Sequence, residues 1–198
     1  NALLKTLEEP GERVLLILLA DHYLKLPATI RSRLQHFALD RLSLDEAKDF
    51  VRSQQLQLSD KQISLLLNLA NNMPLTAIEI AQSAWVEQRS VFLNDWFKLV
   101  SEKNMPLHYV NKWSKNLPFS DLMIMFEYLL GDIVAFKLNQ ELKNTDLNFQ
   151  DLAACYPLEI LFEIYSELQN YKLLISQNVQ SALVLDQLFI KLMYVQLS

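Results

Sequence analysis

The side-chain types that most often carry out chemistry are sparse and scattered in this sequence of 198 residues. The three histidines, His22, His36 and His108, have no second metal-type ligand at helical or loop spacing. Cys155 is the single cysteine and stands in an apolar stretch, where we expect a buried, unreactive thiol. The carboxylates are dispersed, and no serine occupies an elbow such as G-x-S-x-G. We therefore expect no metal site and no catalytic nucleophile, and we predict that the chain itself catalyses no reaction.

The use of glycine argues against a nucleotide-binding loop. Gly11 and Gly131 are the two glycines, and they lie far apart. A Walker A loop or a GxGxxG fingerprint needs two or three glycines within a few residues, where the backbone amides approach a phosphate. The sequence as given therefore carries no glycine-based phosphate cradle, and we expect no bound cofactor.

A short cationic run, Arg31-Ser32-Arg33, is the feature best suited to act on a phosphate. A guanidinium can contact two phosphate oxygens at once and neutralise the charge that gathers on a γ-phosphate during its transfer. On spacing alone, Arg33 is an ordinary surface arginine near a helix end. A functional role for Arg33 therefore needs support from the surrounding sequence.

Charge and hydropathy narrow the classes of partner. The chain has 18 Lys and Arg against 23 Asp and Glu, a net charge of −5 and a pI near 5.2. This balance argues against a free-standing nucleic-acid binder, although it does not exclude contact with DNA inside a larger assembly. The longest apolar run, residues 14–20, is too short to span a bilayer, and no signal-peptide pattern is present. We expect a cytoplasmic protein with no membrane partner.

The first forty residues predict parts of an α/β domain. Residues 1–9 predict the tail of a helix, and residues 14–19 form a continuous aliphatic run that is typical of a strand covered on both faces. A short helix is expected to begin at Pro27, and residues 37–39 predict a second short strand. These elements cannot complete a sheet. We therefore expect residues 1–39 to be the end of an α/β domain whose front part is missing, in a chain that begins inside a helix and without methionine.

From residue 40 onward the pattern is helical. Two capping boxes precede apolar, helically spaced segments: Ser43 with Glu46, and Ser59 with Gln62. Pro74 suits the first position of a third helix. These signals predict a three-helix unit over residues 40–88 and a second helical unit over residues 89–198.

Large apolar anchors are predicted in both helical units. Trp85, Trp96 and Trp113 are spaced like core residues of helices. The last helix is apolar on more than one face, so we expect it to be central or to pack against another subunit. The segments expected to be helical are residues 91–100, 107–113, 120–142, 152–156, 157–173 and 176–197.

Two motifs near the start resemble those of bacterial DNA polymerase III clamp-loader subunits, which are AAA+ proteins. Residues 1–10, NALLKTLEEP, are nearly identical to a segment of that family, and residues 26–34, LPATIRSRL, resemble its LLPTIRSRC box. The aliphatic run follows the first motif as it does in the family, and the helical remainder agrees with the family's architecture. The resemblance implies a mainly α chain made of the C-terminal remnant of an AAA+ α/β base (1–39), a three-helix lid (40–88) and a helical collar for oligomerisation (89–198).

The second motif resembles the serine-arginine-cysteine box of the family. By this resemblance Arg33 is an arginine finger that acts in trans on the ATP of the neighbouring subunit, and Ser32 and Arg31 support it. Leu34 replaces the cysteine of the box at a position we assign to packing, so we expect the finger to be retained. The implied partners are tau/gamma and delta subunits, through the collar and Arg33. The sliding clamp and primed DNA are implied only as partners of the whole complex.

The predicted lid departs from the ATP-hydrolysing members of the family. Those members carry a motif like G-S-x-R-x-A, whose arginine touches the nucleotide, whereas Thr76 stands at the arginine position here. In this respect the chain resembles the delta-prime branch of the family, whose members help to assemble the loader and donate a finger without binding ATP productively. Two alternatives remain: a tau/gamma-type ATPase subunit whose nucleotide residues lie in the missing front part, and a purely structural helical interaction module.

Overall fold

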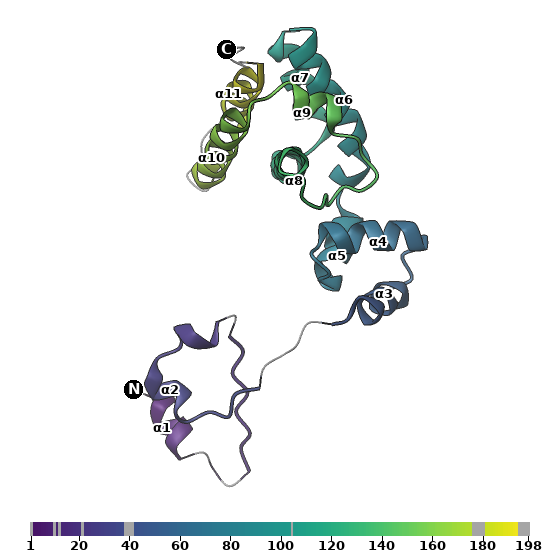
Figure 1. The fold of residues 1–198 in the computed structure, drawn as a ribbon. Coiled ribbons are helices and arrows are strands. Elements are labelled where there is room, and N and C mark those ends of the chain that lie inside the picture. The colour runs from purple at the N-terminus through teal and green to yellow at the C-terminus, as the bar shows by residue number, and fades with distance from the viewer. Residues whose placement is uncertain are drawn as a thin grey trace. The chain divides into compact units, whose positions relative to one another are not determined.

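A computed structural model describes residues 2–9, 11, 13–20, 22–37, 42–103, 105–175 and 181–193, and divides the chain into two compact units, Asn1–Arg41 and Leu42–Ser198 (Figure 1). All regular elements of the described residues are helical. The first unit contains α1 (Ala2–Glu8), the 3₁₀ helix η1 (Tyr23–Lys25) and α2 (Ala28–Arg31). The second contains α3 (Leu44–Ser53), α4 (Asp60–Leu69), α5 (Pro74–Gln82), α6 (Trp85–Ser101), α7 (Pro106–Asn116), α8 (Phe119–Lys137), α9 (Gln150–Ala154), α10 (Leu158–Ile175) and α11 (Ser181–Met193).

The predicted strand over residues 14–19 is wrong. This segment has no strand structure, and its aliphatic side chains are exposed, with Leu15 83% and Leu19 87% accessible. A strand exists only through hydrogen bonds to a neighbouring strand, and the described part of the first unit offers none. Of the second predicted strand, Phe37 lies outside any regular element, while residues 38 and 39 fall outside the described residues. The described residues are mainly helical and contain no strand of an α/β base.

Helix starts in the second unit follow the local signals. In α3, the backbone amide of Glu46 donates to Ser43 Oγ (3.3 Å), and Glu46 Oε2 accepts from the amide of Ser43 (2.8 Å). Ser59 and Gln62 form the same reciprocal pair at the start of α4. Pro74 occupies the first turn of α5, as predicted. Both capping boxes are therefore confirmed.

Helix ends were harder to predict. α8 ends at Lys137 instead of continuing to residue 142, because Asn139 adopts a left-handed backbone conformation (φ 53°) that closes the helix. The expected boundary between residues 88 and 89 falls inside α6, which is continuous over 17 residues. Of the last predicted helix, residues 176–180 and 194–197 lie outside the described residues.

The core of the second unit is aromatic and lies among α6, α7, α8 and α11. Trp85, Trp96 and Trp113 are buried, which confirms their prediction as core anchors. The ring of Phe92 makes edge-on contacts with Trp96 and Trp113, at centroid separations of 6.3 and 4.9 Å, and with Phe126 at 5.5 Å. The fully described helix α11 buries Leu188 and Leu192 completely but leaves Leu183 and Ile190 exposed, so it is central on one face only. No helix among the described residues is both long and apolar enough to cross a membrane.

Candidate functional site

The arginine-bearing turn follows the single helical turn of α2. Pro27 precedes this helix and fixes the backbone at its start. The amide of Arg33 donates to the carbonyl of Ile30 (3.1 Å), and that of Leu34 to the carbonyl of Arg31 (3.4 Å), so the chain keeps turning beyond the helix. The box is thus a short, hydrogen-bonded surface turn rather than an irregular loop.

The side chain of Arg33 is held by its own unit. Its Nε donates to Glu8 Oε1 (2.9 Å), and its Nη2 forms an ion pair with the same oxygen. Its Nη1 donates to the backbone carbonyl of Thr29 at 2.6 Å. The side chain remains 34% accessible and that of Glu8 48% accessible. The guanidinium is therefore at the surface, but two of its edges are occupied.

Ser32 contacts Arg33, and Arg31 lies elsewhere. Ser32 Oγ donates to the carbonyl of Thr29 (3.2 Å) and accepts a long hydrogen bond from Arg33 Nη1 (3.4 Å). Arg31 lies over the ring of Tyr23, with its Cζ 5.6 Å from the ring centroid. Its Nε is buried without a hydrogen-bond partner among the described atoms. The structure brings Ser32 and Arg33 together, whereas Arg31 packs against the ring of Tyr23.

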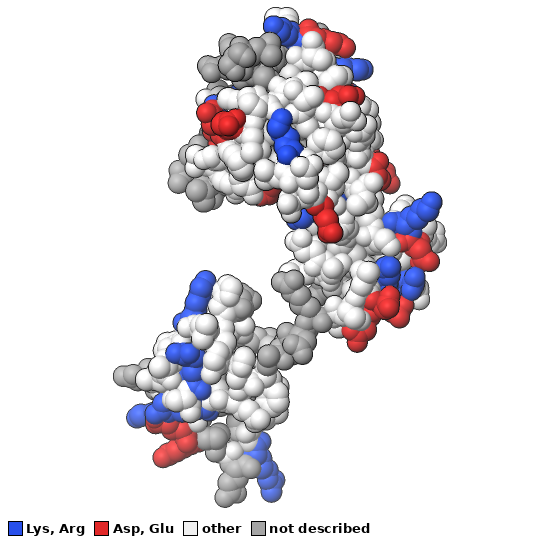
Figure 2. All heavy atoms as spheres, in the orientation of Figure 1, with Lys and Arg blue, Asp and Glu red and all other residues white. Residues whose placement is uncertain are grey.

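Lys and Arg are the more frequent charged residues in the described part of the first unit, although the full sequence of this unit has six Lys and Arg against five Asp and Glu. Figure 2 shows Lys and Arg along the visible face of this unit, whereas both signs are interspersed over the second. The partly exposed guanidinium of Arg33 itself suits an anionic group on another molecule. The described basic residues are Lys5, Arg13, Lys25, Arg31 and Arg33, and the described acidic ones are Glu8 and Glu9.

The turn between α4 and α5 is the stretch that matches the lid motif. Asn71 and Asn72 both have positive φ angles, 52° and 61°. Asparagine tolerates this left-handed conformation better than most residues, and glycine tolerates it best. The backbone here thus has the conformation that suits the glycine of the family's motif, although that glycine is absent. Thr76, on the first turns of α5, offers no cation to a nucleotide.

A buried polar network that the sequence did not reveal holds the segment between α8 and α9. Both carboxylate oxygens of Asp132, on α8, accept hydrogen bonds from the backbone amides of Lys143 and Asn144, at 2.8 and 2.7 Å. The Asn144 side chain donates to the same carboxylate (2.7 Å) and accepts from Arg89 Nη1 (2.8 Å). Arg89 Nη2 also pairs with Asp146 at 2.7 Å. These contacts satisfy the buried polar groups that a long connection would otherwise leave unpaired.

The same segment contacts the predicted lid. Asn68 Nδ2, on α4, donates to the carbonyls of Leu142 and Lys143, both at 2.9 Å. Because these partners are 74 and 75 residues away in the chain, no local pattern could have indicated them. The signal in the sequence is a polar residue on an otherwise apolar helical face, as Asp132 is on α8.

The remaining sequence candidates do not form a site. His22, His36 and His108 are exposed, and His36 stacks on Tyr23 with 4.0 Å between ring centroids. No group of three or more potential metal ligands occurs in the described part of the chain. The expectation of a buried Cys155 is wrong, because the residue is partly exposed at the C-terminal end of the short helix α9. Its thiol donates to the carbonyl of Asp151 (3.3 Å). Partial burial raises the pKa of this thiol.

Comparison with known proteins finds similarity to DNA polymerase III subunits. Residues 1–43 match the family described as "DNA polymerase III, delta subunit". The chain is 34% identical over 115 residues to the DNA polymerase III subunit delta' of Haemophilus influenzae, which covers 58% of this chain and 35% of that protein.

Two further relatives carry other subunit names. The chain is 48% identical over 52 residues to the DNA polymerase III subunit gamma of Buchnera aphidicola subsp. Schizaphis graminum, which covers 26% of this chain and 14% of that protein. It is 33% identical over 88 residues to the DNA polymerase III subunit tau of Bacillus subtilis, which covers 42% of this chain and 16% of that protein. The chain spans about a third or less of the length of these relatives. Together with the two motifs around α1 and α2, these matches show that the chain is similar to subunits of DNA polymerase III.

Proposed function

We propose that this chain is part of a delta-prime-type subunit, which helps to assemble the loader ring and supplies Arg33 to the ATP site of a neighbouring subunit. The observation that carries the proposal is the partly exposed guanidinium of Arg33 on a surface turn of the first unit. The 34% identity to a protein named subunit delta' supports the choice of branch. So does Thr76, which replaces the arginine of ATP-hydrolysing members.

The chemistry asked of Arg33 is electrostatic. During cleavage of the γ-phosphate bond, negative charge spreads over oxygens that a guanidinium contacts in a planar, two-pronged geometry. The neighbour then supplies the nucleotide and its metal ion, and this chain supplies a cation. No catalytic step occurs on this chain in the proposed scheme, and it binds no cofactor of its own.

The domain assignment belongs to the same proposal. Residues 1–39 are the end of the AAA+ base, residues 40–88 the lid, and residues 89–198 the collar that holds the chain to tau/gamma and delta subunits. Exposed apolar residues on collar helices, such as Leu107 on α7 and Phe162 on α10, are consistent with packing against other subunits. The sliding clamp and primed DNA are partners of the assembled loader only.

A tau/gamma-type ATPase subunit is the second candidate, and it is favoured by the matches to proteins named gamma and tau. The two candidates differ in nucleotide binding by the protein itself. Equilibrium dialysis of the full protein with ATP, in the absence of other subunits, separates them. Saturable binding favours the ATPase subunit, and no binding favours the delta-prime branch.

Substitution of Arg33 in the reconstituted loader tests the finger. An arginine finger accelerates phosphoryl transfer by about 10³-fold or more, so Arg33→Ala should silence the ATP site next to this chain. The DNA-stimulated ATPase rate of the loader is then expected to fall by the fraction that this one site contributes. The loader should still assemble, as judged by size-exclusion chromatography. Arg33→Lys should behave similarly, because an ammonium lacks the two-pronged geometry.

Arg13→Ala is the matched control, since it removes an exposed arginine of the same unit outside the box. The ATPase rate of this control should equal that of the wild type. An unchanged rate for Arg33→Ala in a fully assembled loader would reject the finger and leave a structural interaction module.

A further inference from the structure

The guanidinium of Arg33 is folded back onto its own unit. Glu8 accepts from Nε and Nη2 on one edge, and the carbonyl of Thr29 accepts from Nη1 at 2.6 Å on another. The side chain thus lies against α2 and the end of α1, and the hydrogen bonds to Glu8 occupy the edge that would form a two-pronged contact with a phosphate. A finger in this position must first exchange Glu8 for its target.

We propose that Glu8 is a latch that retains Arg33 in this retracted position until the nucleotide of the neighbouring subunit displaces the carboxylate. The proposal rests on the proposed role of Arg33 as a finger and adds the regulation of that same site. Carboxylate and phosphate accept the same paired hydrogen bonds from a guanidinium. The exchange therefore replaces one anion with another and keeps the Nε and Nη2 donors of Arg33 paired.

Glu8 lies at the end of α1, where a carboxylate does not stabilise the helix. Glu8 is the last residue of α1, and the negative end of the helix dipole disfavours a carboxylate there. Arg33, 25 residues later in the chain, compensates this charge. Glu9 follows immediately and is exposed, but the ion pair of Arg33 is made by Glu8 alone of the two. The pairing is therefore selected by geometry and not by general attraction between an acidic and a basic segment.

The exposure of the pair suits a latch. Both side chains are accessible, 34% for Arg33 and 48% for Glu8, so water competes for each of them. Exposed ion pairs of this kind shift an equilibrium only modestly, by about two- to fivefold. A buried pair would hold the finger too firmly to be released by a subunit that approaches from outside, because separation would leave an uncompensated buried charge.

The test is Glu8→Gln in the loader reconstituted with its partner subunits. We expect the ATPase rate without DNA to rise about two- to fivefold, because the finger is no longer retained. The rate at saturating primed DNA is expected to stay unchanged, so the ratio of stimulated to unstimulated rate falls. Glu9→Gln, which removes the same charge from the adjacent residue, should change neither rate. Adding Glu8→Gln to Arg33→Ala should have no further effect, since the latch acts only through Arg33.

Two results would overturn the latch while Arg33→Ala still lowers the rate. If Glu8→Gln lowers both rates in parallel, Glu8 supports the extended finger instead of retaining it. If Glu8→Gln changes neither rate, the ion pair has no influence on the finger. A loader with Arg33→Ala and unaltered rates would instead reject the finger itself, and the latch with it.

Discussion

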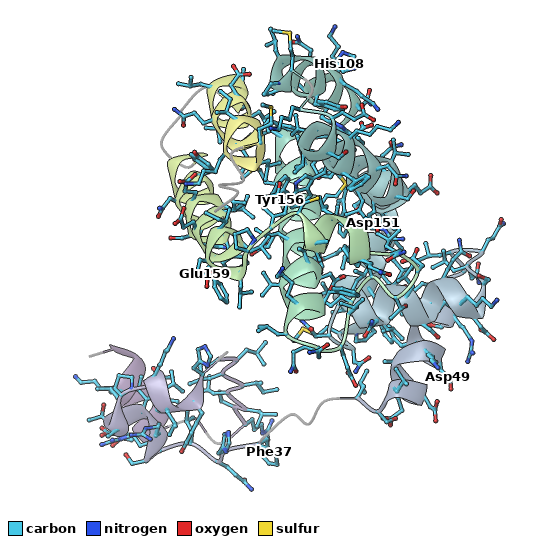
Figure 3. The ribbon with its side chains drawn as sticks, turned by 45° about the horizontal axis from the view of Figure 1, so that its top comes forward. Phe37, Asp49, His108, Asp151, Tyr156 and Glu159 are labelled. Atoms are coloured by element: carbon cyan, nitrogen blue, oxygen red, sulfur yellow. The ribbon has the colours of Figure 1, made fainter. Side chains whose placement is uncertain are left out.

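The phenol oxygen of Tyr156 forms two buried hydrogen bonds that join distant parts of the second unit. It accepts from Trp96 Nε1 on α6 (2.8 Å) and donates to the backbone carbonyl of Leu192 on α11 (2.6 Å). Figure 3 shows Tyr156 in the interior of the helical unit. Burial is the main cause that raises the pKa of this phenol above its usual value. Tyr156 is thus a polar contact that positions α11 on the aromatic core.

Replacing Tyr156 with phenylalanine should lower stability in a pH-dependent way. At about pH 8, two buried groups lose their partner, so the free energy of unfolding should fall by about 1–3 kcal/mol. A raised pKa in the folded state stabilises the wild type fully below about pH 10, and this contribution declines as the pH rises further. The difference between wild type and Tyr156→Phe should therefore shrink toward about pH 11, as measured by urea denaturation.

The partly exposed Tyr165 provides the matched control. Tyr165→Phe should leave the free energy of unfolding within about 0.5 kcal/mol of the wild type at about pH 8. A constant difference between wild type and Tyr156→Phe from about pH 8 to about pH 11 would contradict the assigned environment of the phenol.

Residue roles were predictable where one side chain suffices to indicate them. The three tryptophans are large, apolar and helically spaced, so their burial follows from the sequence alone. The pairing of Arg33 with Glu8 does not follow from the sequence, although the two residues lie in the motifs over residues 26–34 and 1–10. It depends on how α1 and α2 pack across 25 residues of chain, and no spacing rule covers such a contact.

Among the elements, helix starts were predicted better than helix ends or strands. Ser43 and Ser59 cap their helices through contacts three residues away, so the signal is local. Asn139, which ends α8, is a weaker local signal because asparagine occurs in many other contexts. The strand over residues 14–19 needed a partner strand, which a local apolar run cannot guarantee.

The connection between α8 and α9 should depend on Asp132. Asp132→Ala leaves the amides of Lys143 and Asn144 and the side chain of Asn144 without their acceptor in a buried site. Each unpaired group costs about 1–3 kcal/mol, with partial relief from water, so we expect the free energy of unfolding to fall by about 2–4 kcal/mol. Chemical denaturation monitored by tryptophan fluorescence measures this loss.

Glu141→Ala changes an exposed acidic residue of the same connection and is the control for Asp132→Ala. Its free energy of unfolding should stay within about 0.5 kcal/mol of the wild type. Equal stabilities for the two variants would mean that the network around Asp132 does not hold the connection.

At the scale of the whole molecule, the chain divides after Arg41, and the predicted lid and collar share the second unit. The continuous helix α6 and the hydrogen bonds from Asn68 to the connection between α8 and α9 join these two predicted domains. The order of the expected elements along the sequence predicts one boundary between residues 39 and 40 and a second between residues 88 and 89. The sequence pattern could not show that α6 runs through the second boundary, because the segments on both sides of residue 88 are predicted to be helical.

The position of Arg33 in the assembled loader is the most direct test of its proposed role as an arginine finger. A cryo-EM structure of the loader on primed DNA with a non-hydrolysable ATP analogue measures the distance from its guanidinium to the γ-phosphate in the neighbouring subunit. We expect the Nη atoms within about 2.7–3.2 Å of the phosphate oxygens, with Glu8 released from Arg33. Arg33 still bound to Glu8 while the neighbour's site is closed and occupied would contradict both the finger and its latch.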